Sequence, residues 1–200
     1  MTTKAKDNES FVCAAQKWLG VTEDGHAGIL TMAAFLERTG QAPVCETDSA
    51  IPDAYWPMLA KIESGNRPYI KAATSSASGL YQFIRSTWIG EGGKWGGNPT
   101  LAFGGLKPSE AEQLERAKSF TEKNVKALQK AGIPVNPASL YACHFFGAGT
   151  AIKVIGADVN ARADALAGSP ATMANPSILQ DKTVGEFLTW LHKKTGYWAR

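Results

Sequence analysis

The sequence predicts a mainly α-helical protein that consists of a small N-terminal module and a larger second domain. Apolar residues recur at helical spacing along most of the chain, and the alternation typical of strands never persists beyond a few residues. Two capping-box patterns mark helix starts, at Ser109 and at Thr183. A chain of 200 residues is long enough for one domain of ordinary size with a small module attached.

Residues 10–41 predict a module of two or three helices. A first apolar stripe ends at Gly20, where glycine suits a left-handed C-terminal position. A second stripe runs from Leu30 to Phe35. A unit this short buries little apolar surface and is marginal by itself. We assign the module to residues 1–45.

The second domain is assigned to residues 51–200, after a linker. Residues 41–52 contain two prolines and little periodicity, as is typical of a linker. The domain opens with a helix that runs into Glu63, with Pro57 in its first turn. Residues 90–105 are rich in glycine and predict an irregular loop, with a short hairpin as an alternative.

Three longer helices are expected further along the second domain. Capping residues, a proline and glycines mark their limits. The predicted helices run from Ser109 to Gly132, from Asn136 to Gly147, and from Thr183 onward.

Charge and hydropathy exclude several classes of partner. The net charge of +3 favours an anionic polymer mildly, and no basic stripe with interleaved aromatics indicates nucleic acid. No apolar run reaches the eighteen or so residues of a membrane span, so we expect no stable membrane insertion. The N-terminus shows no signal-peptide pattern, so we expect another route if the chain acts outside the cytoplasm.

The cysteines and histidines predict neither a metal site nor a cofactor. Cys13, Cys45 and Cys143 are widely spaced, which favours buried free thiols, with a Cys13–Cys45 bridge as the alternative. The three histidines lack metal-ligand spacing: His26, His144 and His192. We expect a monomer that needs no metal and no cofactor.

Glu63 is the first candidate for chemistry. It follows Leu59 and Ile62 at the end of the predicted apolar helix, and Gln82 comes beyond a loop of small residues. An acid packed on apolar residues resists ionisation, because desolvation penalises its charge. Such a group suits the protonation step of glycosidic bond cleavage. The alternative is an ordinary exposed glutamate near a helix end.

The segments around Glu63 resemble the soluble lytic transglycosylase family. The resemblance rests on Glu63-Ser64-Gly65-Asn66, Gly79-Leu80-Tyr81-Gln82-Phe83 and Ser86-Thr87-Trp88, with Tyr81 and Phe83 in place of the family's methionine and isoleucine. It implies the lysozyme-like fold that goose-type lysozymes share, and cleavage of peptidoglycan glycan strands. By the same resemblance Glu63 is the catalytic acid and base, and the residues expected to contact substrate are Ser64, Ser78, Tyr81, Gln82 and Phe83. The alternatives are a core-facing Gln82 bonded to the backbone, and plain core positions for Tyr81 and Phe83.

A third motif departs from that family. The family usually has alanine-tyrosine-asparagine-alanine-glycine, with the tyrosine reaching toward the acid, and this chain has His144-Phe145-Phe146-Gly147. Aligning the glycines puts His144 where tyrosine is expected, and a similar variant occurs in phage-encoded relatives. We expect His144 to point into the cleft and to orient or polarise Glu63. The alternative is a core histidine beside Phe145.

The N-terminal module is similar to the peptidoglycan-binding domain family. The resemblance rests on Leu19-Gly20, Asp24-Gly25, Gly28 and Thr31, and departs at His26-Ala27. It implies binding to the cell wall, and a helical cap on the second domain is the alternative.

The acids of the chain bear on the type of reaction. No aspartate occurs between Glu63 and Asp158, and the nearest downstream acid is Glu91. The family resemblance implies a lytic transglycosylase, in which one acid suffices and the product carries 1,6-anhydro-muramic acid. The alternatives are a hydrolytic muramidase helped by Glu91, a secreted antibacterial effector of the same fold, and a non-catalytic wall-binding protein.

The resemblance and the missing signal pattern together favour a phage endolysin. Such an enzyme is made in the host cytoplasm and acts on the cell wall after release, or it is carried by the virion.

Overall fold

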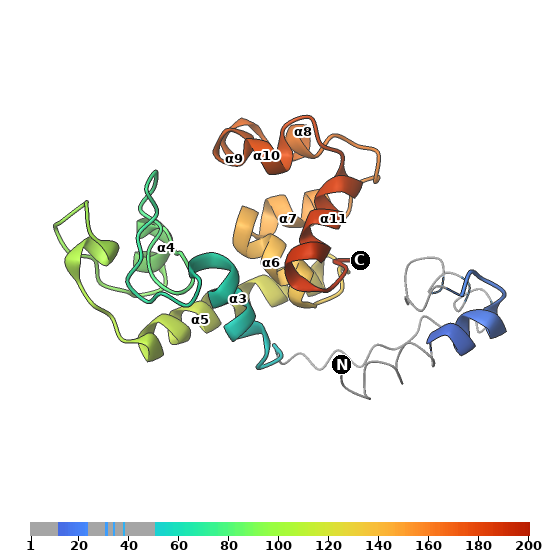
Figure 1. Cartoon of the computed structure of the whole chain (residues 1–200), viewed down its shortest axis with the longest axis horizontal. Helices are drawn as coiled ribbons and strands as arrows, with labels where there is room; N and C mark the ends of the chain where they lie inside the picture. The colour runs from blue at the N-terminus through green and yellow to red at the C-terminus, as the bar shows by residue number, and fades with distance from the viewer. Residues whose placement is uncertain (1–11, 24–30, 32–33, 35–37, 39–50) are drawn as a thin grey trace. The chain divides into compact units, whose positions relative to one another are not determined.

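The computed structural model describes residues 12–23, 31, 34, 38 and 51–200, which are mainly helical (Figure 1). The chain divides into two compact units, Met1–Asp48 and Ser49–Ala199. In the part that the structure describes, β-structure is limited to three isolated bridges and no strand forms. The predicted mainly α class is therefore confirmed.

The described part of the first unit contains the first predicted helix. Residues 12–19 are helical, and Gly20 follows with a left-handed φ of 74°. The side-chain amide of Gln16 donates to the Thr31 hydroxyl at 3.0 Å, within the buried face of the helix. Most of the second predicted stripe, like the Asp24-Gly25 turn, lies outside the described residues.

The second unit is built from helices joined by short loops, with one longer irregular region (Figure 1). Their bounds are α3 Tyr55–Ser64, α4 Arg85–Gly90, the 3₁₀ helix η1 Ala102–Gly105, α5 Glu110–Lys130, α6 Pro137–Phe146, α7 Ala148–Ile155, α8 Ala163–Ala167, α9 Ser169–Ala174, α10 Pro176–Leu179 and α11 Val184–Thr195.

Helix α6 forms the centre of this unit. Six consecutive residues of α6, from Ala138 to Cys143, are buried, and the helix packs against α5, α7 and α11. A helix that is apolar on all sides needs such surroundings. Leu59, Leu128 and Leu191 bring α3, α5 and α11 into the same core. The core therefore fixes α3, which carries Glu63, relative to α6, which carries His144.

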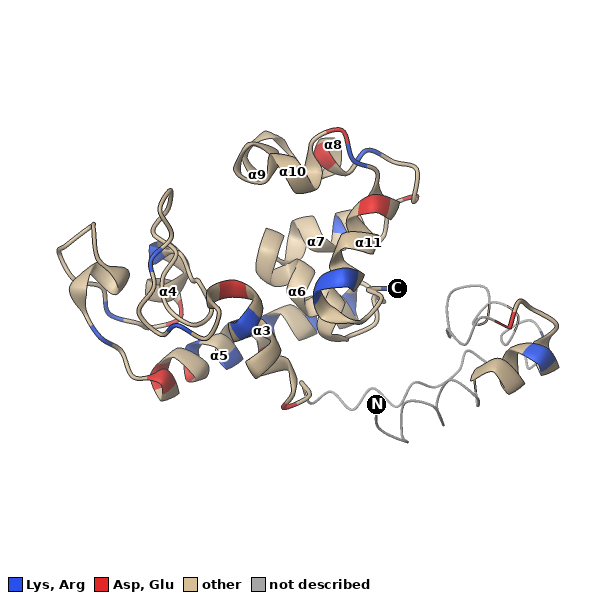
Figure 2. Ribbon diagram, in the orientation of Figure 1, with Lys and Arg blue, Asp and Glu red and all other residues tan. Residues whose placement is uncertain are grey.

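Local signals explain where the longer helices begin. The capping boxes at Asn136 and Thr183 form in full. At Ser109 only half of the box forms: its hydroxyl accepts from the Glu112 N–H at 3.1 Å, while the Glu112 carboxylate faces Arg116 at 3.8 Å. The acidic first turn of α5, visible in Figure 2, favours this helix start through the helix dipole.

The sequence analysis did not predict α4 or the four helices α7 to α10. Each spans at most eight residues. About two turns are too short for apolar periodicity to stand out from chance. Their positions follow from tertiary packing, in which α7 lies on α6 and α8 lies on α7.

The glycine-rich region between α4 and α5 is irregular, as predicted, but forms no hairpin of strands. Its two sides are joined by backbone hydrogen bonds from Gly96 to Phe103 and from Asn98 to Gly104, each at 3.0 Å. A Cβ on Gly96 would lie 2.3 Å from the Gly104 carbonyl oxygen. Glycine is needed here because the two backbones touch.

Two of the three cysteines lie within the described residues. Cys13 and Cys143 are free, so the Cys13–Cys45 bridge does not form; Cys45 itself lies outside the described residues. Burial raises the pKa of the Cys143 thiol to about 12, so this thiol stays neutral.

None of the helices described is both long and apolar enough to cross a bilayer.

Candidate active site

Glu63 is the last residue but one of α3 and is half-buried. The helix ends there because Gly65 takes a left-handed conformation, with φ 61°, and its N–H donates to the Lys61 carbonyl at 3.2 Å. Figure 1 shows this end of α3 between α4 and α6. The carboxylate therefore projects from a rigid helix at the place where the chain turns away.

Tyr141 of α6 lies beside Glu63, within hydrogen-bonding range of its carboxylate. Burial raises the pKa of the Tyr141 phenol well above its ordinary value, and the charge of Glu63 and the hydrogen bond to it add to the effect. The phenol therefore keeps its proton and is the group that can donate a hydrogen bond to the carboxylate. Tyr141 is itself buried, so the donor is fixed in position. This contact makes Tyr141 the side chain that orients Glu63.

His144 lies one helical turn after Tyr141 and near the same acid. Burial lowers the pKa of His144, while the Glu63 charge and a backbone hydrogen bond with Tyr81 oppose that shift. The ring is consequently neutral at pH 7. It packs between Phe83, at 5.4 Å between ring centres, and Phe120, at 6.1 Å.

The buried Nδ1 of His144 has no hydrogen-bond partner within the described chain. His144 is thus close enough to interact electrostatically with Glu63, but the hydrogen-bond donor beside the carboxylate is Tyr141. The ring lies near Glu63, as the predicted role requires. It also packs among aromatic side chains, as the core alternative requires.

The sequence analysis missed Tyr141. Residues three apart on a helix share one face, so Tyr141 and His144 present side chains in the same direction. Aligning the glycines of the third motif drew attention to His144 alone. The signal that was available is the tyrosine one turn earlier on the same face of this helix.

The two serines predicted to contact substrate are buried, and their hydroxyls bond to the backbone. Ser64 donates to the Ala60 carbonyl at 2.9 Å and accepts from the Arg67 N–H at 3.2 Å. Ser78 donates to the Ser76 carbonyl at 2.9 Å and accepts from the Phe103 N–H at 3.2 Å. These bonds favour structural roles for both serines over contact with a ligand.

Gln82 stabilises the base of the loop that precedes it. Its side-chain amide donates to the Gly79 carbonyl at 2.9 Å and to the Ile70 carbonyl at 3.4 Å. The residue has a positive φ of 48°, which is uncommon for a non-glycine residue and occurs often at functional sites. The amide N–H groups are thus used within the protein, while the carbonyl Oε1 accepts no hydrogen bond from the residues that the structure describes.

Tyr81 and Phe83 are both buried, on different sides of the segment. Tyr81 meets Trp56 edge to face, with ring centres 6.4 Å apart, and burial followed by the charge of Glu110 raises its pKa. Phe83 meets Phe120 at 5.3 Å and packs on His144. Phe83 therefore belongs to the surroundings of Glu63, while Tyr81 packs with the N-terminal half of α3.

Glu91, the helper in the hydrolytic alternative, is fully engaged elsewhere. Both of its carboxylate oxygens lie 2.8 Å from the Lys123 ammonium, and one also accepts from Ser119 at 2.8 Å. Only 7% of its side chain is exposed. A carboxylate held by a cation and a hydroxyl is a poor base for activating water, because its lone pairs are occupied.

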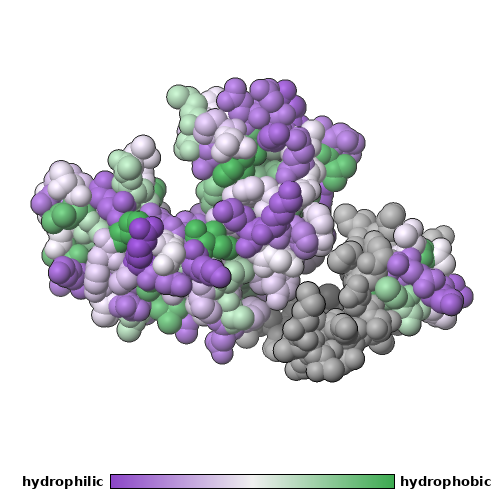
Figure 3. Space-filling view, in the orientation of Figure 1, coloured by the Kyte–Doolittle hydropathy of each residue, from purple (hydrophilic) through white to green (hydrophobic). Residues whose placement is uncertain are grey.

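The surface of this unit is indented between two parts. Figure 3 shows the indentation between the part that contains α4 with its loops and the part that contains α8 to α10.

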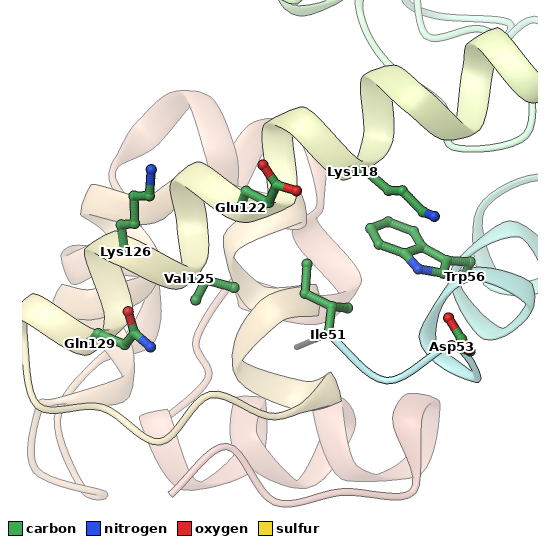
Figure 4. A pocket seen from close by; sticks show the side chains of 8 residues that line it. All are labelled: Ile51, Asp53, Trp56, Lys118, Glu122, Val125, Lys126 and Gln129. Atoms are coloured by element: carbon green, nitrogen blue, oxygen red, sulfur yellow. The ribbon is translucent and has the colours of Figure 1, made fainter. Parts of the chain in front are cut away.

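A separate groove of about 470 Å³ lies between the start of α3 and α5 (Figure 4). Its charges balance, since Lys118 and Lys126 stand with Asp53 and Glu122, and no predicted site residue lines it.

Comparison with known proteins assigns this chain to no family, so its function has to be argued from the residues of the site. No family model and no curated protein matches this sequence. In the part of the chain that the structure describes, no three histidine, cysteine or acidic side chains gather as metal ligands would. The chemistry of the site consists of one half-buried carboxylate, a phenol that hydrogen-bonds it and a neutral imidazole nearby.

Proposed function

We propose that this protein is a peptidoglycan-cleaving lytic transglycosylase with Glu63 as its catalytic acid and base. The observation that carries the proposal is the buried Tyr141 phenol, a neutral hydrogen-bond donor that lies beside the Glu63 carboxylate. Within the described residues Glu63 forms no ion pair, so its carboxyl group is not bound to a cation. A single acid fixed by a neutral donor is what a proton-shuttling group requires.

In the proposed reaction Glu63 first donates its proton to the oxygen that bridges N-acetylmuramic acid and N-acetylglucosamine. The β-1,4 bond breaks, and the acetamido group of the substrate stabilises the positive sugar centre. Glu63, now a carboxylate, takes the proton from the C6 hydroxyl of the muramic acid, whose oxygen closes the 1,6-anhydro ring. Tyr141 stabilises the carboxylate between the two transfers by donating its hydrogen bond.

The surroundings of Glu91 favour transglycosylation over hydrolysis. A hydrolase of the two-carboxylate type needs a second acid that activates water or attacks the sugar. Glu91 is bound to Lys123 and Ser119 and is not free for either role. The C6 hydroxyl of the substrate then replaces water as the nucleophile.

Product analysis tests the proposal. Purified protein is incubated with peptidoglycan, and the released fragments are analysed by mass spectrometry. We expect anhydro-muropeptides, which lack the elements of water that a reducing end contains. Fragments with reducing ends only would contradict transglycosylation and support a muramidase, and a complete absence of fragments would support a non-catalytic wall-binding protein.

Replacing Tyr141 by phenylalanine tests the hydrogen bond to Glu63. We expect Y141F to lower kcat about 10- to 100-fold, because a hydrogen bond to a charged group contributes about 1.5–3 kcal/mol. The ring remains to pack against Trp190, at 5.9 Å, so thermal stability changes little. Initial rates on soluble glycan strands give the comparison.

Tyr55 provides the matched control. It is buried and feels the charge of Glu63, but within the described chain its hydroxyl has no hydrogen-bond partner. We expect Y55F to retain full activity and equal or slightly higher stability, because it removes an unsatisfied polar group. Equal loss of activity in Y55F and Y141F would contradict a specific role for the Tyr141 phenol.

The biological setting is proposed on the same basis. We propose that the chain acts as a phage endolysin on the bacterial cell wall, with its N-terminal module as a wall-binding unit. In that module Trp18 is exposed, and the Arg38 guanidinium lies 4.6 Å from its ring centre. An exposed indole with a fixed cation offers contact area to an anionic glycan.

A further inference from the structure

A second groove, of about 430 Å³, lies between two loops near α4. One loop covers residues 71–76 and the other covers residues 95–99. The residues with polar or aromatic side chains in its lining are Lys71, Thr74, Ser75, Ser76, Arg85 and Trp95. No acidic residue lines it, in contrast to the groove of Figure 4, where acids and bases balance.

The groove contains two cations that are not neutralised: the ammonium of Lys71 is held by backbone carbonyls, and Arg85 is anchored through its backbone. The Lys71 ammonium donates to the Ala72 carbonyl at 3.1 Å and to the Ser75 carbonyl at 2.9 Å, which leaves its third proton free. The Arg85 backbone N–H is bound to the Ser76 hydroxyl at 3.0 Å. Among the residues that the structure describes, neither side chain forms an ion pair.

Trp95 gives the groove a fixed aromatic surface. Its half-buried ring packs on Phe103 with the centres 5.8 Å apart, and Phe103 is almost completely buried. The neighbouring Lys94 carbonyl accepts the Trp88 indole N–H at 2.9 Å, which holds the start of this loop. A fixed indole provides a face for sugar or apolar groups, and two uncompensated cations favour carboxylates.

The groove is connected to the proposed active site through the backbone. Gln82 binds the carbonyl of Ile70, the residue directly before Lys71, and the Gly79 N–H binds the same carbonyl at 2.9 Å. The loop that carries Lys71 is thus anchored by the segment that contains Gln82 and Phe83. A glycan strand lying across that segment brings its side groups to the loop.

We propose that this groove binds the carboxylate-bearing peptide stem of the glycan strand, with Arg85 and Lys71 as its anion-binding groups. The inference rests on the proposed function and deepens it, because it names the part of the substrate that the enzyme recognises. The N-acetylated sugars of the strand are neutral, so the stem supplies the charges that match the two cations. Trp95 packs against the sugar or the apolar part of the stem.

Binding measurements in the E63Q background test this inference without cleavage. Two probes are compared by titration calorimetry at one ionic strength: soluble glycan strands with their stems, and the same strands after the stems are removed enzymatically and the lactyl carboxylates exposed by that cleavage are converted to amides. We expect tighter binding of the strands with stems. We also expect Arg85→Gln to weaken that binding about tenfold, or about 1.4 kcal/mol, and to leave the stem-free strands unaffected.

Lys130→Gln is the matched control. It removes one positive charge from an exposed position at the end of α5, outside the groove. It should leave both affinities unchanged. Equal affinity for the two probes, an equal effect of R85Q on both, or the same loss in K130Q would overturn the inference.

The two proposals fail in distinguishable ways. If the wild-type protein cleaves neither strand, the proposed function is wrong while the binding comparison still stands. If it cleaves both strands equally well and R85Q binds both as the parent does, the function stands and the stem site is wrong.

Discussion

Replacing Glu63 by glutamine is expected to lower peptidoglycan cleavage about a thousandfold. Glutamine keeps the shape of the side chain and can still accept the Tyr141 hydrogen bond, but it cannot donate or take up a proton. The fold should persist, because Glu63 is only half-buried and belongs to no ion pair in the described chain. Release of soluble fragments from purified peptidoglycan measures the loss.

Two further measurements make the E63Q result decisive. Glu115→Gln removes an acid of the same type from α5, where 72% of the side chain is exposed, and it should leave the activity unchanged. Sedimentation of E63Q with insoluble peptidoglycan should show that wall binding persists. Undiminished cleavage by E63Q would exclude Glu63 as the acid.

Replacing Gly79 by alanine is expected to destabilise the second unit by about 2–5 kcal/mol. Gly79 has φ 79°, and a Cβ there would lie 2.4 Å from Gln113 Oε1 and 2.4 Å from the Phe103 ring. The left-handed conformation costs an alanine about 1–2 kcal/mol, and overpacking costs about 1–3 kcal/mol more. Thermal unfolding followed by far-ultraviolet circular dichroism should show Tm lowered by about 4 °C or more.

The loss in G79A is large because Gln113 joins three loops. Its buried side chain accepts from the Leu80 N–H at 2.8 Å and donates to the Pro68 carbonyl at 3.1 Å and the Pro108 carbonyl at 3.2 Å. Moving it leaves buried polar groups without partners. We therefore expect G79A to lower activity as well, since Gln82 and Phe83 follow in the same segment.

Gly149 supplies the control for Gly79. It lies in α7, and a Cβ there would meet nothing within 4 Å. Gly149→Ala should leave the free energy of unfolding unchanged or raise it by less than about 1 kcal/mol. If G79A unfolded at the same temperature as G149A, close packing around Gly79 would be refuted.

The longer helices were predictable from the sequence because their signals are local. A capping residue, a proline or a glycine acts through atoms within a few residues, so Asn136, Gly147 and Thr183 mark helix limits wherever the helices pack. The same holds for the end of α3 next to Glu63, which Gly65 determines. The shorter helices lack such signals and depend on packing.

The candidate site was predictable only in part. The position of Glu63 at a helix end follows from the sequence, but the partner that hydrogen-bonds it comes from α6, which lies far along the chain. Ser64 and Ser78 were predicted to contact substrate, yet both are buried and their hydroxyls bond to the backbone. Which way a side chain points is set by contacts that span long sequence separations.

The sequence by itself determined that this chain is mainly helical, where its longer helices begin and end, and that one acid stands at the end of an apolar helix. Only the tertiary structure decided that Tyr141 orients this acid, that Glu91 is bound by Lys123, and that Lys71, Arg85 and Trp95 share one groove. The physical reason is range: caps and apolar periodicity act within a few residues, whereas a site is formed by side chains that the packed core brings together.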